Sequence, residues 1–375
     1  MRKRGLSEYD KSDVNRLLKA LQHQEADRLP HLEFWIRSKA VYEYVLEHQI
    51  SYNGRDGQAG SPIVRPDDYV EFALRLGMDA VVCSFSWRPN NVFEQTATGS
   101  RHYLDGTIKT WADLDDLEPP PSLADQLSHL ELYLRTAQGT GVGVIANFTS
   151  FFDSALRAIG ISDALYMFYD NRPLLEKLMD ILLEHQAKVI QAVCDRFGDD
   201  LTAVLINDDI AFHTGLIIHP DMFMPIFPPR MQRLIAPALE HGRPVLMHSD
   251  GKIEKVVPIL YDLGFAALHP VQPEFNDIYA LKEQWAGKMA FIGNISTALL
   301  AQGSEEEIEA RVCEHCVRLG PGGGYVLGSS GSIVEGMPPE NFVAMTRAVH
   351  RYGRYPLSSP ATPLPGNLGP GGMGG

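Results

Sequence analysis

The chain has 375 residues, with 47 Asp or Glu against 33 Lys or Arg, so its net charge is −14 with His neutral. This acidic balance argues against binding to nucleic acids or anionic membranes, which require a cationic surface. Four Cys residues are too few for a disulfide-stabilised scaffold of this length and fit a reducing compartment. Residues 1–13 contain no apolar segment typical of a secretory signal, and no apolar run has the roughly 20 residues of a membrane helix. We therefore expect a globular cytoplasmic protein.

In chain order, a predicted extra helix over residues 7–27 precedes eight short apolar runs. The runs cover residues 30–36, 79–85, 141–148, 201–210, 243–248, 266–272, 289–295 and 323–329. Each is continuously apolar, as expected for parallel strands buried on both faces. Helical patterns lie between them, the longest over residues 172–197 and others over 221–241, 253–263 and 305–319. Eight such units predict an α/β protein with a (β/α)8 TIM barrel, and an open doubly wound sheet is the alternative.

Two segments lie outside this repeat. Residues 88–111 are polar and carry the turn signal Leu104-Asp105-Gly106, which predicts a hairpin inserted after the second strand. Residues 356–375 are rich in Pro, Gly and Ser, which is typical of a disordered tail. Because no comparable linker occurs upstream, we expect residues 1–355 to form a single domain.

Polar residues follow most of the predicted strands, where TIM barrels place their active sites. The candidate site residues are Glu33, Arg37, Asn147, Asp208, Asp209, His248, Asp250, Gln272, Asn294 and Ser330. The predicted strand that contains Gln272 also carries His269. We expect Asp208, Asp209, His248 and Asp250 to be catalytic and the other candidates to bind the substrate.

The most informative unit is His248-Ser249-Asp250-Gly251. An imidazole and a carboxylate two residues apart at a strand end are suitable ligands for a first-row metal such as zinc. They could also form a proton-transfer pair. The alternative is structural, with His248 bonded to a backbone carbonyl and Asp250 capping the next helix.

Asp208 and Asp209 are adjacent carboxylates at the end of a buried strand. Such a pair costs electrostatic energy unless a cation or a proton compensates it, so a functional role is one interpretation and loop solvation or helix capping is the other. Cys313 and Cys316 flank His315 in a helical pattern without a second Cys pair. We expect them to be ordinary thiols rather than metal ligands.

Several stretches together resemble the uroporphyrinogen decarboxylase superfamily. They read LINDDIAFHTGLIIHPDMFMPIFPPRMQRLI, VLMHSDGKIEKVVPILYDLGFAALHPVQPE, FIGNIST, GPGGGYVLGSS and PPENFVAM. The resemblance covers roughly residues 15–355 and is strongest from Ala203 onward. It implies a (β/α)8 barrel and one of two activities. These are cofactor-free decarboxylation of uroporphyrinogen and zinc-dependent methyl transfer with a corrinoid protein.

The chain departs from both branches of this superfamily. Decarboxylases carry an Arg-rich R-Q-A-G-R-Y motif after the first strand, but this chain has FWIRSKA there, with Arg37 as its one arginine. Decarboxylases also carry a G-H-G-I motif after the last strand, but this chain has Ser330-Gly331-Ser332-Ile333 at that position. The methyltransferases carry H-x-C, which His248 matches, but Asp250 replaces the Cys. Gly331 stands where a second Cys aligns.

A zinc site built from His248, Asp250 and Glu33 would be harder than a thiolate site and a stronger Lewis acid. The resemblance therefore implies a corrinoid-linked methyltransferase that moves a methyl group between a small substrate, such as a methyl ether, and a cobalamin protein. The alternatives are a decarboxylase-like lyase of a carboxylated molecule or porphyrinogen, which needs no cofactor, and a non-catalytic binding module. The sequence is also compatible with a homodimer.

Overall fold

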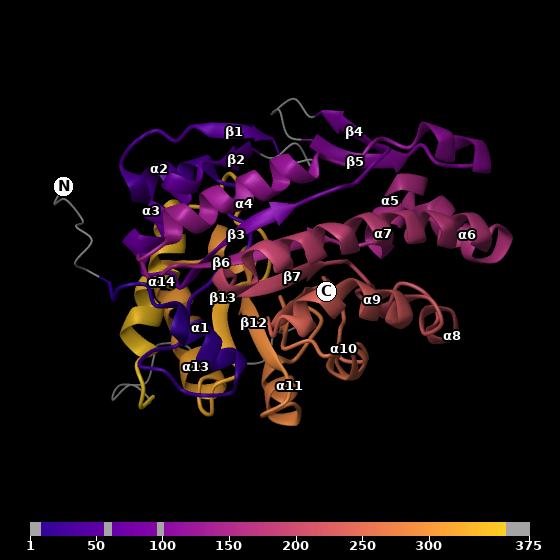
Figure 1. Ribbon diagram of the computed structural model, residues 1–375. Coiled ribbons are helices and arrows are strands. Elements are labelled where there is room, and N and C mark those ends of the chain that lie inside the picture. Colours follow the sequence, from indigo (N-terminus) through magenta and orange to yellow (C-terminus); the bar gives the residue numbers. More distant parts are fainter. Residues whose placement is uncertain (1–8, 56–61, 96–100, 358–375) are drawn as a thin grey trace.

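The computed structural model describes residues 9–55, 62–95 and 101–357 (Figure 1). Its centre is a curled sheet of seven parallel strands in the order β13-β12-β11-β10-β7-β6-β3. The strands are β3 (Ala80–Phe85), β6 (Gly143–Thr149), β7 (Ala203–Asn207), β10 (Val245–His248), β11 (Ala267–His269), β12 (Ala290–Ile295) and β13 (Tyr325–Ser329). They coincide with seven of the eight predicted runs, and the α/β class is confirmed.

The first predicted run, residues 30–36, is not a regular strand. It forms isolated parallel bridges to the β13 side of the sheet, His31 with Leu327 and Ile36 with Ile333. At its other side, the His31 carbonyl accepts a hydrogen bond from Asp79, which directly precedes β3. The ladder is interrupted because Pro30 has no N–H and because the His31 N–H donates to the Asp79 carboxylate. The run thus contacts both edges of the curled sheet, which is consistent with the predicted TIM barrel.

Both faces of the sheet are buried, which explains why the runs are continuously apolar. Alternate strand residues form an inner cluster with residues of the first run and of α1 (Val14–Leu21). Its members include Leu17, Leu32, Phe34, Val82, Ile145, Leu205, Leu246, Ile292 and Val326. The intervening residues, such as Val204 and Ile206, pack in the outer cluster against the helices. The side chain of Asp13 caps α1, which ends before His23, so this helix is shorter than the predicted 7–27.

Helices surround the sheet (Figure 1). They are α2 (Lys39–Leu46), α3 (Pro66–Leu76), α4 (Leu123–Ala137), α5 (Phe152–Ile159), α6 (Ile161–Asp170), α7 (Arg172–Phe197), α8 (Pro220–Phe223), α9 (Phe227–Glu240), α10 (Val257–Leu263), α11 (Ile278–Gln284), α12 (Thr297–Gln302), α13 (Glu305–Leu319) and α14 (Pro339–Tyr352). The α7 and α13 bounds match the predictions. The predicted helix over 221–241 is instead two helices, because Pro225 interrupts it. None of the helices in the described ranges combines the length and apolar character needed to cross a membrane.

The predicted insertion is confirmed as an antiparallel hairpin of β4 (Asn91–Gln95) and β5 (Arg101–Gly106). The predicted position of its turn was wrong, because Leu104, Asp105 and Gly106 belong to β5, where Asp105 and Gly106 pair with Val92 and Asn91. It lies against α5 (Figure 1), where the Ile108 N–H donates to the Ala158 carbonyl and the Tyr103 hydroxyl donates to the Arg157 carbonyl at 2.8 Å. A Cβ atom on Gly106 would lie 2.2 Å from the Ala158 carbonyl oxygen, so glycine permits this close approach.

Two short hairpins and two 3-10 turns complete the described chain. Two further hairpins pair β1 (Tyr52–Arg55) with β2 (Pro62–Val64) and β8 (Ala211–Phe212) with β9 (Gly215–Leu216). Short 3-10 turns cover Trp111–Asp116 and Gly198–Asp200. Most of the predicted tail, residues 358–375, lies outside the described residues.

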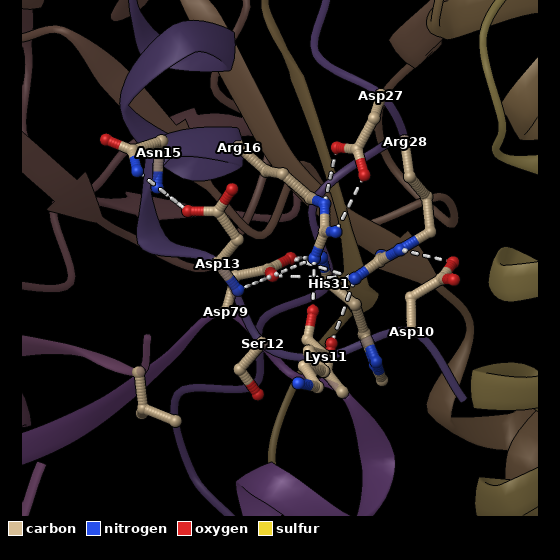
Figure 2. A network of polar contacts seen from close by, with 12 residues as sticks. Asp10, Lys11, Ser12, Asp13, Asn15, Arg16, Asp27, Arg28, His31 and Asp79 are labelled. Atoms are coloured by element: carbon tan, nitrogen blue, oxygen red, sulfur yellow. Dashed lines mark hydrogen bonds and ion pairs between the residues drawn. The ribbon is translucent and has the colours of Figure 1, made fainter. Parts of the chain in front are cut away.

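A buried network of charges ties the chain before and after α1 to the start of β3 (Figure 2). The Asp79 carboxylate lies 3.4 Å from the guanidinium of Arg28, whose side chain is fully buried, and 3.1 Å from that of Arg16. It also accepts the backbone N–H groups of Asp13 and His31. Because buried charges are stable only when paired, this network fixes α1 beneath the inner cluster. The candidate functional site lies at the opposite end of the sheet, at the carboxyl ends of the strands.

Candidate functional site at the carboxyl ends of the strands

Three side chains from neighbouring strand ends converge on one point. His248 is the last residue of β10, Asp250 follows it by two residues, and Asp209 follows β7 by two residues. His248 Nε2 lies 3.7 Å from Asp209 Oδ1 and 3.9 Å from Asp250 Oδ1. One potential ligand atom from each residue lies within 4.8 Å of the others. We call these three residues the ligand cluster.

Backbone hydrogen bonds hold Asp250 in this position. Its N–H donates to Asp209 Oδ1 at 3.1 Å, and the N–H of Gly251 donates to Gln272 Oε1 at 2.7 Å. Gly251 has a φ of 94°, and a Cβ there would lie 2.6 Å from the Ala211 carbonyl oxygen. The helix-capping alternative for Asp250 does not apply, because α10 begins only at Val257 and has no side-chain cap.

His248 is also paired with His269. The two residues occupy the same register row of the adjacent strands β10 and β11, and their Nδ1 atoms are 2.8 Å apart. The Trp35 ring packs edge-on against His248 with 4.5 Å between centroids, and Phe34 packs against His269 at the same distance. Burial and the neighbouring His248 hold the pKa of His269 well below its ordinary value. The structural interpretation of His248 predicted a hydrogen bond to a backbone carbonyl. The structure instead shows a hydrogen bond between His248 and a second imidazole, that of His269.

The two adjacent Asp residues point to different environments. Asp208 is fully buried and accepts the Asp153 N–H at 2.7 Å, near the start of α5. Burial raises the pKa of Asp208 to about 8, which favours the protonated form of this carboxyl group. Asp209 instead reaches the ligand cluster. Only the second carboxylate therefore faces the site.

A cavity of about 290 Å³ lies over the ligand cluster, and we call it the mouth cavity. Its lining comprises Trp35, Arg37, Arg88, Phe93, His102, Tyr103, Arg157, Asn207, Asp209, His248, Asp250, Gly331 and Ser332. Phe93, His102 and Tyr103 come from the inserted hairpin, so this insertion forms one wall. A second cavity of about 200 Å³ shares Arg157, Asp209 and Asp250 with the first, so it borders the same two carboxylates.

Arginines compensate the negative charge of the mouth cavity. Asp153 Oδ2 lies 2.6 Å from Arg88, and Asp153 Oδ1 lies 2.8 Å from Arg157. The Arg157 guanidinium is also 4.0 Å from Asp209. Asp153 therefore holds two guanidinium groups beside the ligand cluster. Asp153 and Asp209 therefore lie beside guanidinium groups, whereas Asp250 Oδ1 is buried without a hydrogen-bond partner in the described residues.

Some predicted substrate residues lie at these cavities. Arg37 lines the mouth cavity, and Gln272 lines the second cavity. Together with the ligand cluster, they are the predicted residues that the structure brings to one place.

The other predicted substrate residues lie elsewhere. Glu33 is buried against Ser329, and the structure does not bring it to His248 and Asp250 as a ligand. The buried Asn147 donates to Ser84 Oγ, and Asn294 donates to the Val271 carbonyl. Ser330 Oγ accepts the Thr297 N–H. These four side chains have structural partners and do not line either cavity.

Sequence reasoning did not select several residues that build the site. His269 lies in the predicted strand over residues 266–272, which follows the strand that ends with His248, and this order of the strands was the available signal. Arg88 and Phe93 lie in the predicted insertion, and Arg157 lies in a helix. Nothing in their local sequence indicates that they meet at the mouth cavity.

The fold and the position of the site define the class: a parallel α/β protein with a polar site at the carboxyl ends of its strands. A family model for uroporphyrinogen decarboxylase (URO-D) matches residues 95–352. The chain belongs to this family, which confirms the resemblance noted in the sequence.

Solved structures with a similar fold include a methyltransferase from Methanosarcina mazei, with 18% sequence identity and a TM-score of 0.68. That alignment covers 92% of this chain and 99% of the methyltransferase. A glycoside hydrolase aligns with 10% identity and a TM-score of 0.44, over 87% of this chain and 99% of the hydrolase. No match was found among curated proteins.

Proposed function

We propose that the protein is an enzyme that transfers a methyl group between a small substrate and a corrinoid carried by a partner protein, using a zinc ion held by Asp209, His248 and Asp250. The observation that carries this proposal is the convergence of these three side chains beneath the mouth cavity. The likeness of the fold to a methyltransferase supports it.

The ligand cluster suits a divalent metal. A His nitrogen and two carboxylate oxygens are ordinary zinc ligands, and the mouth cavity leaves room for a substrate atom as the next ligand. Asp250 Oδ1 is buried without a hydrogen-bond partner in the described residues, and a cation would satisfy it. A cation would also compensate the two carboxylates. The donor set therefore fits the metal that the family resemblance implies.

A zinc ion bound here would act as a Lewis acid that polarises an ether oxygen of the substrate. The residues of the chain bind and orient that substrate. Arg37 provides a positive charge at the cavity wall, and Trp35 and Tyr103 provide aromatic surfaces that exclude water. The corrinoid partner approaches the mouth of the cavity in this proposal.

Metal analysis of protein purified without a chelator tests the proposal. We expect about one zinc per chain, and we expect its loss in His248→Ala but not in the control His48→Ala, which removes an exposed imidazole. The corrin spectrum should then change when Co(I) cobalamin and candidate methyl ethers are added. Zinc well below one per chain and unchanged by His248→Ala would contradict the metal site.

A decarboxylase-like lyase is the second candidate, because Arg37, Arg88 and Arg157 all line the mouth cavity. Guanidinium groups bind carboxylates in bidentate geometry, so a carboxylated small molecule suits this wall. This activity needs no metal. Release of carbon dioxide from such a substrate by metal-free protein, without any change in the corrin spectrum, would favour it over methyl transfer.

A further inference from the structure

The ligand cluster borders two cavities. Arg157, Asp209 and Asp250 line both the mouth cavity and the second cavity, so these side chains lie between the two. The cavities have volumes of about 290 and 200 Å³, and small-molecule sites commonly have about 300–1,000 Å³. A substrate held at the ligand cluster can therefore extend into both cavities.

The second cavity has a more apolar lining than the mouth cavity. Leu156 of α5 and Ile161 of α6 line it. Phe212 of β8 and Ile217, which follows β9, also line it. The mouth cavity has three arginines in its lining, whereas the second cavity has one. A ligand in the second cavity would therefore contact mainly hydrocarbon surface.

Backbone hydrogen bonds fix the part of this lining that the β8–β9 hairpin provides. The Lys252 N–H donates to the Phe212 carbonyl at 2.8 Å, and the Ile217 N–H donates to the Ile210 carbonyl at 3.0 Å. The Ile210 N–H donates to Ser249 Oγ at 3.1 Å. These bonds attach the hairpin to the segment that follows β10. Because the lining is already formed, a ligand binds there at a smaller entropy cost.

Most polar side chains of the second cavity already have partners in the protein. Asp153 lies 2.8 Å from Arg157, and Gln272 Oε1 accepts a backbone N–H at 2.7 Å. The His213 ring stacks on Phe275 with 4.3 Å between centroids. The carboxylates of the ligand cluster are the exception, and they repel an anion. A carboxylate placed in this cavity would therefore lose hydration without gaining an unpaired counter-charge.

We propose that the second cavity is a subsite for the part of the substrate that remains after methyl transfer, and that this part is a small uncharged apolar group. The methyl group of the substrate then faces the mouth cavity, from which the corrinoid partner approaches. This division of the substrate rests on the proposed function. The binding of an apolar group in the second cavity does not depend on it.

The volume of the second cavity limits the size of this group. An apolar cavity of about 150 Å³ can hold a benzene molecule, so the cavity of about 200 Å³ accommodates one ring of about five or six carbon atoms. The substrate class is therefore the methyl ethers of small, uncharged, apolar alcohols.

Titration of the full chain with cyclopentyl methyl ether, after removal of metal by a chelator, tests the subsite independently of zinc. Spectra of 13C-labelled Ile methyl groups report binding, with signals assigned from Ile161→Val and Ile217→Val. We expect both signals to shift, whereas the signal of Ile259 on α10 should stay constant.

Methoxyacetate is the matched control ligand, because it has a methyl ether and a carboxylate in place of the ring. It should shift neither the Ile161 nor the Ile217 signal. Constant Ile signals with cyclopentyl methyl ether, or equal shifts with methoxyacetate, would overturn the proposal.

A variant that fills the second cavity provides another test. Ile217→Trp should weaken the binding of cyclopentyl methyl ether by at least about tenfold. The control Leu123→Trp enlarges an exposed apolar side chain on α4 and should bind like the wild type. Ile161→Trp fills the same cavity from α6 and replaces Ile217→Trp if that variant does not fold. A folded filling variant that binds the ether as tightly as the wild type would contradict the subsite.

Zinc binding and ether binding are measured independently. If both Ile signals shift but the protein binds no zinc, the proposed function fails and the apolar subsite stands. If the protein binds zinc and changes the corrin spectrum but neither Ile signal shifts, the subsite fails and the proposed function stands.

Discussion

Glu33 and Ser329 contact each other at two points in the interior. The Ser329 N–H lies 2.8 Å from Glu33 Oε1, and the Ser329 hydroxyl lies 2.5 Å from Glu33 Oε2. The same hydroxyl lies 2.7 Å from the Gly331 carbonyl, to which its single hydrogen can be donated. A protonated Glu33 completes this pattern by donating to Ser329 Oγ. Burial raises the pKa of Glu33 to about 8, in agreement with the protonated form.

This raised pKa predicts a pH-dependent stability. The folded protein retains the Glu33 proton up to about pH 8, whereas the unfolded chain loses it near the ordinary value of 4.5. The folded state thus binds more protons in this window, so its stability falls as pH rises, by at most about 1.4 kcal/mol per pH unit. Glu33→Gln mimics the protonated form. We expect urea unfolding to show that its stability relative to wild type increases from pH 5 to pH 8.

The control for this experiment is Glu254→Gln, which changes an exposed carboxylate. Its stability difference from wild type should stay constant across the same pH range. A constant difference for Glu33→Gln as well would show that Glu33 is ionised in the folded protein.

Neighbouring carboxylates should differ in their effect on metal binding. Asp209→Asn removes a member of the ligand cluster and should lower zinc affinity by at least about tenfold. Asp208→Asn is a matched control, because Asp208 points toward α5 and accepts the Asp153 N–H. We expect it to bind zinc like the wild type. Competition with a chromogenic chelator measures both, and equal losses would mean that the pair acts as one unit.

The ion pair between Arg88 and Asp153 should contribute to stability through its burial. The side chains are 8% and 6% exposed, so Asp153→Asn leaves the buried Arg88 guanidinium without its carboxylate, whereas Asp153 in Arg88→Met is still paired with Arg157 at 2.8 Å. We expect Asp153→Asn to lower the free energy of unfolding by about 3–5 kcal/mol and Arg88→Met to lower it by less. The double variant should lose less than the sum. Strictly additive losses would indicate that the two residues do not interact.

Docking of the inserted hairpin depends on Gly106. An added Cβ would meet the Ala158 carbonyl oxygen at 2.2 Å, so Gly106→Ala should push the hairpin from α5 and cost about 1–3 kcal/mol. Leu104→Ala in the same hairpin changes a side chain that is 63% exposed and should cost less than about 0.5 kcal/mol. Thermal unfolding measures both variants. A Gly106→Ala variant as stable as Leu104→Ala would contradict this docking.

Local sequence patterns correctly predicted the elements that depend on the apolar character of neighbouring residues in the chain. Continuous apolar runs correctly indicated the seven strands, because both faces of the sheet are buried. The irregularity of residues 30–36 could not be predicted, because the His31 N–H donates to Asp79, 48 residues away in the chain. The bounds of α1 were too wide for a similar reason, since the residues around it join the network of Asp79.

The same distinction holds for the site. The spacing of His248 and Asp250 placed both at one strand end, and the structure brings them together with Asp209. The partner of Glu33 is Ser329, 296 residues further along the chain, so no local pattern could separate a ligand from a buried support. Arg157 lies on α5 and reaches the mouth cavity only through the packing of that helix.

The inserted hairpin allows the wall of the mouth cavity to vary independently of the strands of the sheet. Phe93, His102 and Tyr103 line the mouth cavity from a segment that belongs to none of the repeating strand–helix units. Changes in length or composition of that segment can reshape what the cavity admits while the interior packing is conserved. The shape of the cavity entrance can therefore change through a segment that lies outside the strands of the central sheet.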